Sequence, residues 1–312
     1  MKPLLWIAVL LSWSSVAQAD CNLAIAAGNI TIDWTLNYTI KSFTFTVTRA
    51  AAPVSNCVYG IGFTKGTATD YTTRRAINGL NAANYQLYPD TTKANILKDK
   101  PAILSSNDVI MDNYADGIAG QHTLTYYVDI PYVDATSPRL LASGDFVETY
   151  TLNVYEGADP TLWGAPITSA AVTLTIRVPK IIALSLVDPG GTFDDAKTIK
   201  NSNFGLLSPG QAVAMDVRIR SNAGYQVTFQ SLRSANLKHL TANSLVPYKL
   251  YVNSEWVDVS GGGAVQGLDI SGQTGLGGQG YAIRAVIQPF LGAGRLAGSY
   301  SDQITVTAIT KE

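Results

Sequence analysis

The chain has 312 residues, and its 22 Lys and Arg nearly balance its 23 Asp and Glu, giving a formal charge of −1. The basic residues are scattered and form no stripe, so we expect no nucleic-acid partner. A chain of this length predicts two domains.

The first 19 residues, MKPLLWIAVLLSWSSVAQA, have the pattern of a secretory signal peptide. A Lys near the start precedes an apolar run from Leu4 to Leu11, and the segment ends on the small-residue motif A-Q-A. The mature protein is therefore predicted to begin at Asp20 and to be exported. Lipidation of Cys21 is an alternative, disfavoured because the residue before it, Asp20, is not small.

Cys21 and Cys57 are the only two cysteines. In an exported protein they predict a disulfide, worth about 4 kcal/mol in the chain-entropy model. A redox or metal site is disfavoured because the sequence has no C-x-x-C motif.

Short alternating apolar and polar runs, separated by Gly, Pro, Asn and Asp, predict an all-β fold of sandwiches. In the first half, strands are expected near residues 22–34, 40–49, 57–64, 83–88, 122–130, 146–155 and 169–179. In the second half, they are expected near residues 180–187, 212–220, 224–231, 246–252, 280–288 and 300–309.

An internal repeat relates the two halves. Three segment pairs are similar and occur in the same order: 144–156 with 298–310, 84–90 with 247–253, and 58–63 with 224–229. The offsets (298 − 144 = 154, 247 − 84 = 163 and 224 − 58 = 166) drift as loops of different length would require. We therefore predict domains at residues 20–179 and 180–312, the second lacking a counterpart of strand 169–179.

Two motifs carry a family resemblance. RRAINGLNAANYQLYPD (residues 74–90) resembles the R…L-x-Y-x-L-Y-x-D stretch of spore coat protein U domains. GDFVETYTLNVYE (144–156) and GSYSDQITVTAIT (298–310) resemble that family's terminal G-x-Y-x-D-x-(I/V)-T-V-T strand. The long insert between Asp90 and His122 and the absence of cysteines from the second half depart from the family pattern.

The resemblance implies a pilin-type, immunoglobulin-like sandwich in each half, with the last strand of the second missing. Such domains form archaic chaperone–usher pili, and the two-domain arrangement resembles their tip adhesins. The implied partners are a periplasmic chaperone, an outer-membrane usher and an adjacent pilin subunit that donates the missing strand. Only one residue would precede Cys21 in the mature chain, so we expect this protein to accept a strand and donate none, at the pilus tip on the cell surface.

Two apolar strand faces of the second half are expected to form the groove for the donated strand. The groove candidates are Ile181, Ile182, Leu184, Leu186, Ile304, Val306 and Ala308. They would be uncovered because the chain stops soon after Thr310. The alternative is that they are ordinary core positions of a complete sandwich.

Three loops of the first half are expected at its distal end, and all carry apolar residues. The candidate surface-binding residues are Ala51, Ala52, Pro53, Val54, Ile103, Leu104, Val109, Ile110, Met111, Leu162 and Trp163. Exposed apolar clusters mark contact surfaces, so we expect these loops to attach cells to abiotic or host surfaces, as in biofilm formation. A carbohydrate pocket around Trp163 is the rival, and folding back of the loops over these side chains is a third possibility.

We expect no catalytic residues, no cofactor and no dedicated metal site. His122 and His239, one in each half, lack a nearby nucleophile pattern. GLGGQG (275–280) precedes a strand-like segment, contrary to a dinucleotide motif. Asp108, Asp112 and Asp116 do not have EF-hand spacing, which leaves at most an opportunistic calcium site. The alternative to an adhesin is a secreted coat protein, carbohydrate-binding protein or enzyme acting alone.

Overall fold

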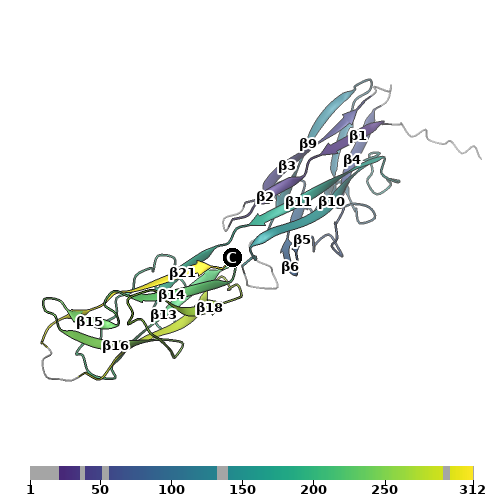
Figure 1. Cartoon of the computed structure of the whole chain (residues 1–312). Helices are drawn as coiled ribbons and strands as arrows, with labels where there is room; N and C mark the ends of the chain where they lie inside the picture. Colours follow the sequence, from purple (N-terminus) through teal and green to yellow (C-terminus); the bar gives the residue numbers. More distant parts are fainter. Residues whose placement is uncertain (1–20, 36–38, 51–55, 132–139, 291–295, 312) are drawn as a thin grey trace, which may run out of the picture.

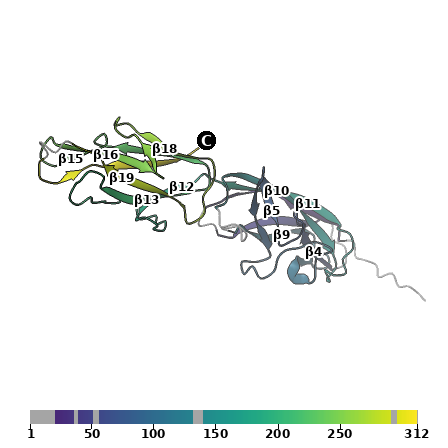
Figure 2. The ribbon, with the colours of Figure 1, turned by 90° about the horizontal axis from the view of Figure 1, so that it is seen from below.

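The computed structural model describes residues 21–35, 39–50, 56–131, 140–290 and 296–311. Strands dominate these residues, which contain one short 3₁₀ helix, η1 (Ser106–Asp108). Figures 1 and 2 show the strands up to β11 gathered in one group and those from β12 onward in another. The predicted all-β architecture of two sandwiches is confirmed. The predicted signal peptide lies outside the described residues.

The first half is a sandwich of two sheets. Its strands are β1 (Leu23–Ala27), β2 (Ile30–Asp33), β3 (Lys41–Arg49), β4 (Cys57–Phe63), β5 (Arg75–Asn78), β6 (Asn81–Asn84), β7 (Gln86–Tyr88), β8 (Ile110–Tyr114), β9 (Gly120–Asp129), β10 (Gly144–Glu156) and β11 (Thr168–Val178). One sheet has the order β1-β3-β9-β7 and the other β2-β11-β10-β4-β8, with the β5–β6 hairpin attached to β10. Inward-facing aromatic and aliphatic side chains from both sheets form one buried cluster.

The segment predicted as one strand over residues 22–34 is instead two strands in different sheets. β1 pairs with β3, whereas β2 runs parallel to β11. The chain changes sheet at Gly28 and Asn29, and the Asn29 side chain accepts a hydrogen bond from the backbone amide of Thr173 in β11 (2.9 Å).

The predicted disulfide is present, and both Cys21 and Cys57 are fully buried. Cys21 lies just before β1 in one sheet, and Cys57 begins β4 in the other. The bond therefore fastens the two layers of the first sandwich together at one end.

The second half repeats this plan with fewer strands. Its strands are β12 (Ile182–Val187), β13 (Ala212–Ser221), β14 (Tyr225–Ser231), β15 (Asn236–His239), β16 (Leu245–Val252), β17 (Glu255–Val257), β18 (Val265–Ile270), β19 (Gln279–Ile287), β20 (Tyr300–Ser301) and β21 (Ile304–Thr310). The sheet orders are β12-β13-β19-β16-β15-β20 and β18-β14-β21, and β17 pairs with β16. A second buried cluster fills the space between these sheets.

Strand pairing confirms the internal repeat. In the first half, Leu152 of β10 lies opposite Phe63 of β4. In the second half, Val306 of β21 lies opposite Phe229 of β14. The offsets, 306 − 152 = 154 and 229 − 63 = 166, equal those found in the sequence. β21 is therefore the counterpart of β10, and β14 the counterpart of β4.

Candidate functional site: an open strand edge and a loop-borne apolar end

β10 and its counterpart β21 differ in what covers their second edge. β10 pairs with β4 on one side and with β11 on the other, from Gly144↔Val178 to Val154↔Thr168. Within the described residues, β21 pairs with β14 alone, and β12 pairs with β13 alone. At β12 and β21, each sheet of the second half thus ends in an edge strand that pairs with no further strand among the described residues.

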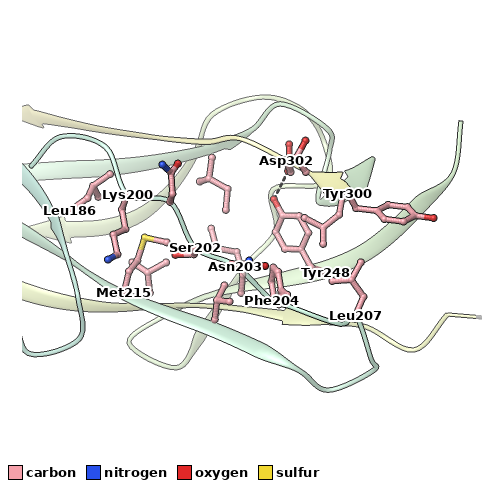
Figure 3. Close-up of a pocket in the computed structure, with 18 of the residues that line it drawn as sticks. Leu186, Lys200, Ser202, Asn203, Phe204, Leu207, Met215, Tyr248, Tyr300 and Asp302 are labelled. Carbon is pink, nitrogen blue, oxygen red and sulfur yellow. Dashed lines mark hydrogen bonds between the residues drawn. The ribbon is translucent and has the colours of Figure 1, made fainter. Parts of the chain in front are cut away.

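A cavity of about 450 Å³ opens between these two edges (Figure 3). β21 contributes Ile304 and Val306, and β12 contributes Leu186. Aliphatic and aromatic side chains of both sheets form its inner walls: Val213, Met215, Val217, Phe229, Leu237, Leu250, Ile283 and Ala285. The cavity is therefore the exposed interior of the second sandwich.

Burial along the two counterpart strands shows the effect of the open edge. Five alternate residues of β10 are at most 4% exposed: Phe146, Glu148, Tyr150, Leu152 and Val154. Their counterparts at offset 154 are all only partly buried: Tyr300, Asp302, Ile304, Val306 and Ala308. Each of these five positions, from Tyr300 in β20 to Ala308 in β21, therefore keeps a solvent contact that its counterpart on β10 has lost.

Six of the seven predicted groove residues pack around the second core. Ile182, Leu184, Leu186, Ile304, Val306 and Ala308 are partly buried against it. Ile181 is also partly buried, but it is not among the residues packed there, and its backbone amide donates to the side-chain oxygen of Asn222 (2.8 Å). The prediction that these residues accept a strand stays a prediction.

Sequence reasoning missed a segment that lies along the groove, residues 197–207, which we call the strap. The amide of Leu186 in β12 donates to the carbonyl of Lys197 (2.6 Å), so the strap uses part of the free β12 edge. Phe204 and Leu207 pack partly buried against the core, and Phe204 lines the cavity. The apolar run F-G-L-L inside a loop-like segment was the available signal.

Polar side chains close one end of the cavity. Asp302 accepts hydrogen bonds from the hydroxyls of Ser231 (2.6 Å) and Tyr248 (2.5 Å), the latter drawn in Figure 3. Burial, together with this bond to a carboxylate, raises the pKa of Tyr248 far above its ordinary range. The Asp302 carboxylate is thus satisfied from within the second half.

The loops of the first half present fewer apolar side chains than expected. Ile103, Val109 and Trp163 are only 3–5% exposed and form a small buried cluster with Tyr155, against which Met111 packs partly buried. The prediction that Ile103, Val109 and Trp163 are exposed is therefore wrong. The folded-back alternative applies to these three, and a carbohydrate pocket built on Trp163 loses its aromatic platform.

The loops fold back because their side chains meet partners on β10. The Trp163 ring stacks on Tyr155 with a centroid separation of 4.9 Å, and its indole N–H donates to the carbonyl of Gly157 (2.8 Å). The Tyr155 hydroxyl and the Asn153 amide both donate to the buried Asp99 carboxylate (2.6 and 2.5 Å). These bonds tie the loop at Asp99 to the loop at Trp163.

Two of the predicted apolar loop residues do remain exposed. Leu104 and Leu162 are 77% and 79% exposed, and each directly follows or precedes a residue of the buried cluster. Ile110 and Met111 are the first two residues of β8, and both are partly buried. The remaining candidates, Ala51, Ala52, Pro53 and Val54, lie outside the described residues.

His122 has a structural setting. Its Nδ1 lies 2.6 Å from a carboxylate oxygen of Asp112, which also accepts a hydrogen bond from the Tyr59 hydroxyl (2.7 Å). The described residues contain no group of three or more His, Cys, Asp or Glu that could hold a metal ion. No helix in that part of the chain is long and apolar enough to cross a membrane.

Comparison with known proteins gives similarity in structure only, since no family model and no curated protein matches the chain. A chain of the CsuC–CsuE chaperone–tip adhesion subunit pre-assembly complex, from the archaic chaperone–usher Csu pili of Acinetobacter baumannii, is similar at 14% identity, with 92% of this chain and 99% of that chain covered and a TM-score of 0.42. The CupB6 tip adhesin of Pseudomonas aeruginosa is similar at 12% identity, 92% and 94% coverage and TM-score 0.41. The enterotoxigenic Escherichia coli CFA/I adhesin CfaE is similar at 12% identity, 92% coverage of both chains and TM-score 0.35. At these values, the similarity does not establish a function for this chain.

Proposed function

We propose that the chain is the tip adhesin of a chaperone–usher pilus. Its second half, residues 180–312, joins the fibre by accepting a strand from an adjacent pilin subunit. Its first half, residues 20–179, attaches the cell to abiotic or host surfaces, as in biofilm formation. The protein would reach the cell surface through the periplasm, with a chaperone and an outer-membrane usher as assembly partners.

The observation that carries this proposal is the pair of free edges, β12 and β21, on either side of an apolar cavity. An uncovered edge beside exposed apolar side chains is an aggregation hazard, which proteins relieve by pairing or covering the edge. A strand inserted between β12 and β21 would bury the partly exposed face of β21 and pair its unpaired backbone groups. The first half supports this proposal, because there β11 pairs with the second edge of β10 and covers its inward-facing side chains.

Leu104 and Leu162 support the surface-binding part of the proposal. Both side chains lie on loops anchored by the same buried cluster, and both are about four-fifths exposed. Such apolar tips on a firm base lose little conformational entropy on contact. An apolar surface is thus a better fit than a sugar, which needs an accessible aromatic face and polar partners.

Separate expression of the two halves in an oxidising periplasm tests the strand-accepting role. Residues 20–179 should yield a protein that melts cooperatively, whereas residues 180–312 should aggregate or be degraded without a partner strand. The physical reason is that β10 of the first half is paired on both sides, whereas its counterpart β21 pairs with β14 alone and leaves apolar side chains of the second core open to solvent. Cooperative melting of both isolated halves would favour a self-contained secreted protein.

A further inference from the structure

We propose that the accepted strand runs antiparallel to β21 and carries the side-chain size pattern of β11, with large apolar residues opposite Tyr300, Asp302 and Ile304 and a small one opposite Val306. This inference rests on the proposed function and specifies its partner. The strand-accepting groove receives an extended segment that resembles residues 168–178 of this same chain, TSAAVTLTIRV.

The internal repeat supplies the register. In the first half, Ile176 lies opposite Phe146, Leu174 opposite Glu148, and Val172 opposite Tyr150. Ala170 lies opposite Leu152, and Thr168 opposite Val154. Because β21 matches β10 at offset 154 and pairs with its neighbour in the same register, each of these β11 residues acquires a defined opposite position in the segment 300–308, which runs from β20 into β21.

The shape of the cavity agrees with this size pattern. Along this part of the chain it is lined by residues 298–302, Ile304 and Val306, and Ala308 is not among its lining residues. The transferred register places large β11 residues opposite the stretch from Gly298 to Ile304, where the hollow is. The smaller Ala170 and Thr168 fall opposite Val306 and Ala308, where the hollow ends.

An acidic residue in the groove does not conflict with an apolar partner. In the first half, Glu148 faces Leu174, yet its carboxylate is occupied by the Thr67 amide (3.3 Å) and hydroxyl (2.7 Å). Asp302 is likewise occupied by Ser231 and Tyr248. In both halves the carboxylate finds its partners within the sandwich, so the opposite strand position can be apolar without leaving a buried charge unpaired.

The direction of the strand agrees with the geometry of the chain. β21 ends beside the junction of the two halves, where Lys180 Nζ donates to the carbonyl of Lys311 (2.7 Å; Figure 1). A strand antiparallel to β21 therefore enters at the junction and leaves at the far end of the second half. A donating subunit whose body follows its extension is then placed away from the first half, whereas a parallel strand would direct that body into it.

Cysteine pairing in the full-length chain tests direction and register together. A copy of residues 168–178 is appended after Glu312 through a flexible Gly/Ser linker long enough to permit either direction. The chain carries Ile304→Cys, and the appended copy carries Val172→Cys, Ala170→Cys or Leu174→Cys in three separate variants. The native cysteines are already paired in a disulfide, so they do not compete. Opposite residues of an antiparallel pair have Cα atoms about 4.5–5.5 Å apart, within disulfide range.

The expected result is a crosslink with Val172→Cys alone. Hydrogen exchange is measured in parallel on the appended chain without added cysteines, and the β21 amides should exchange about 100-fold more slowly than in the chain without the copy. A matched control copy carries Ala170→Leu and Leu174→Ala, which keeps the composition class and alternation but inverts the sizes. It should give less than about a tenth of that protection.

The outcomes separate the two proposals. If the β21 amides are protected but the crosslink forms with Ala170→Cys or Leu174→Cys, or does not form at all, the proposed register is wrong and strand acceptance stands. If the size-inverted copy protects the amides equally well, the proposed size pattern is wrong and strand acceptance again stands. Absence of protection by either copy, with the isolated second half melting cooperatively, overturns both. Absence of protection with an unstable second half overturns the β11 pattern alone.

Discussion

Trp163 should act as the base of the apolar loop tip rather than as part of its contact surface. It is 4% exposed, stacks on Tyr155 and bonds to Gly157, whereas its neighbour Leu162 is 79% exposed. Replacing a buried Trp by Ala costs about 3–5 kcal/mol. The lower end, about 3 kcal/mol, applies here because the cluster is small and lies at the edge of the sandwich.

A loss of about 3 kcal/mol lowers the melting temperature of a domain of this size by roughly 6–12 °C. Trp163→Ala should show that shift in calorimetry, together with weaker attachment to a hydrophobic surface. Trp163→Phe, which keeps a ring against Tyr155 but loses the indole N–H, should lose about 1 kcal/mol. Leu162→Ser should leave the melting temperature unchanged, because exposed positions contribute within about 0.5 kcal/mol, yet should reduce attachment.

Two results would refute this reasoning. A melting temperature for Trp163→Ala within about 2 °C of the parent would mean that the ring is not packed as described. Full attachment by a folded, secreted Leu104→Ser, Leu162→Ser double variant would remove both side chains from the contact surface.

Three further predictions concern stability. Replacing both Cys21 and Cys57 by Ala should cost about 4 kcal/mol in denaturant unfolding, because the bond closes a loop of 36 residues; an unchanged midpoint would show that the unfolded chain is not constrained by it. Tyr248→Phe should lower the free energy of unfolding of the second half by about 1.5–3 kcal/mol, because it removes a hydrogen bond to the Asp302 carboxylate. A change in the unfolding transition of the first half would contradict that assignment. Burial raises the pKa of Tyr150 well above 10 in the folded state, so the folded protein binds more protons than the unfolded chain above that pH, and stability should fall as pH rises past about 10. Tyrosinate absorbance followed together with circular dichroism checks this, and ionisation of all tyrosines before any unfolding would be the contrary result.

The sequence allowed the strand framework to be predicted because alternation is local. Ile304, Val306 and Ala308 alternate with polar residues, and the structure places all three on the inner face of β21. The change of sheet at Gly28 and Asn29 was not predictable from alternation, since β1 and β2 both continue the same apolar pattern. The short β5–β6 hairpin carries too few residues to give a period.

Burial of loop side chains was harder to predict than burial in strands. Ile103, Val109 and Trp163 are buried because Asp99, Asn153 and Tyr155 hold two distant loops together, and no local pattern reports such a contact. The internal repeat was more informative than the loop sequences. It identified the strand of the second half whose outer edge is open, because the second half has no segment that corresponds to β11.

The strap has a consequence for the speed of assembly. Since Lys197 already accepts the hydrogen bond of the Leu186 amide and Phe204 already lies in the cavity, an incoming strand must replace a resident segment. On the proposed mechanism, the observed rate rises with donor concentration only until strap release becomes limiting, and then reaches a plateau. Ile199 and Leu206 lie on the same segment and are already 81% and 92% exposed, so releasing the strap exposes little additional apolar surface from these side chains. The rate at the plateau should therefore be high.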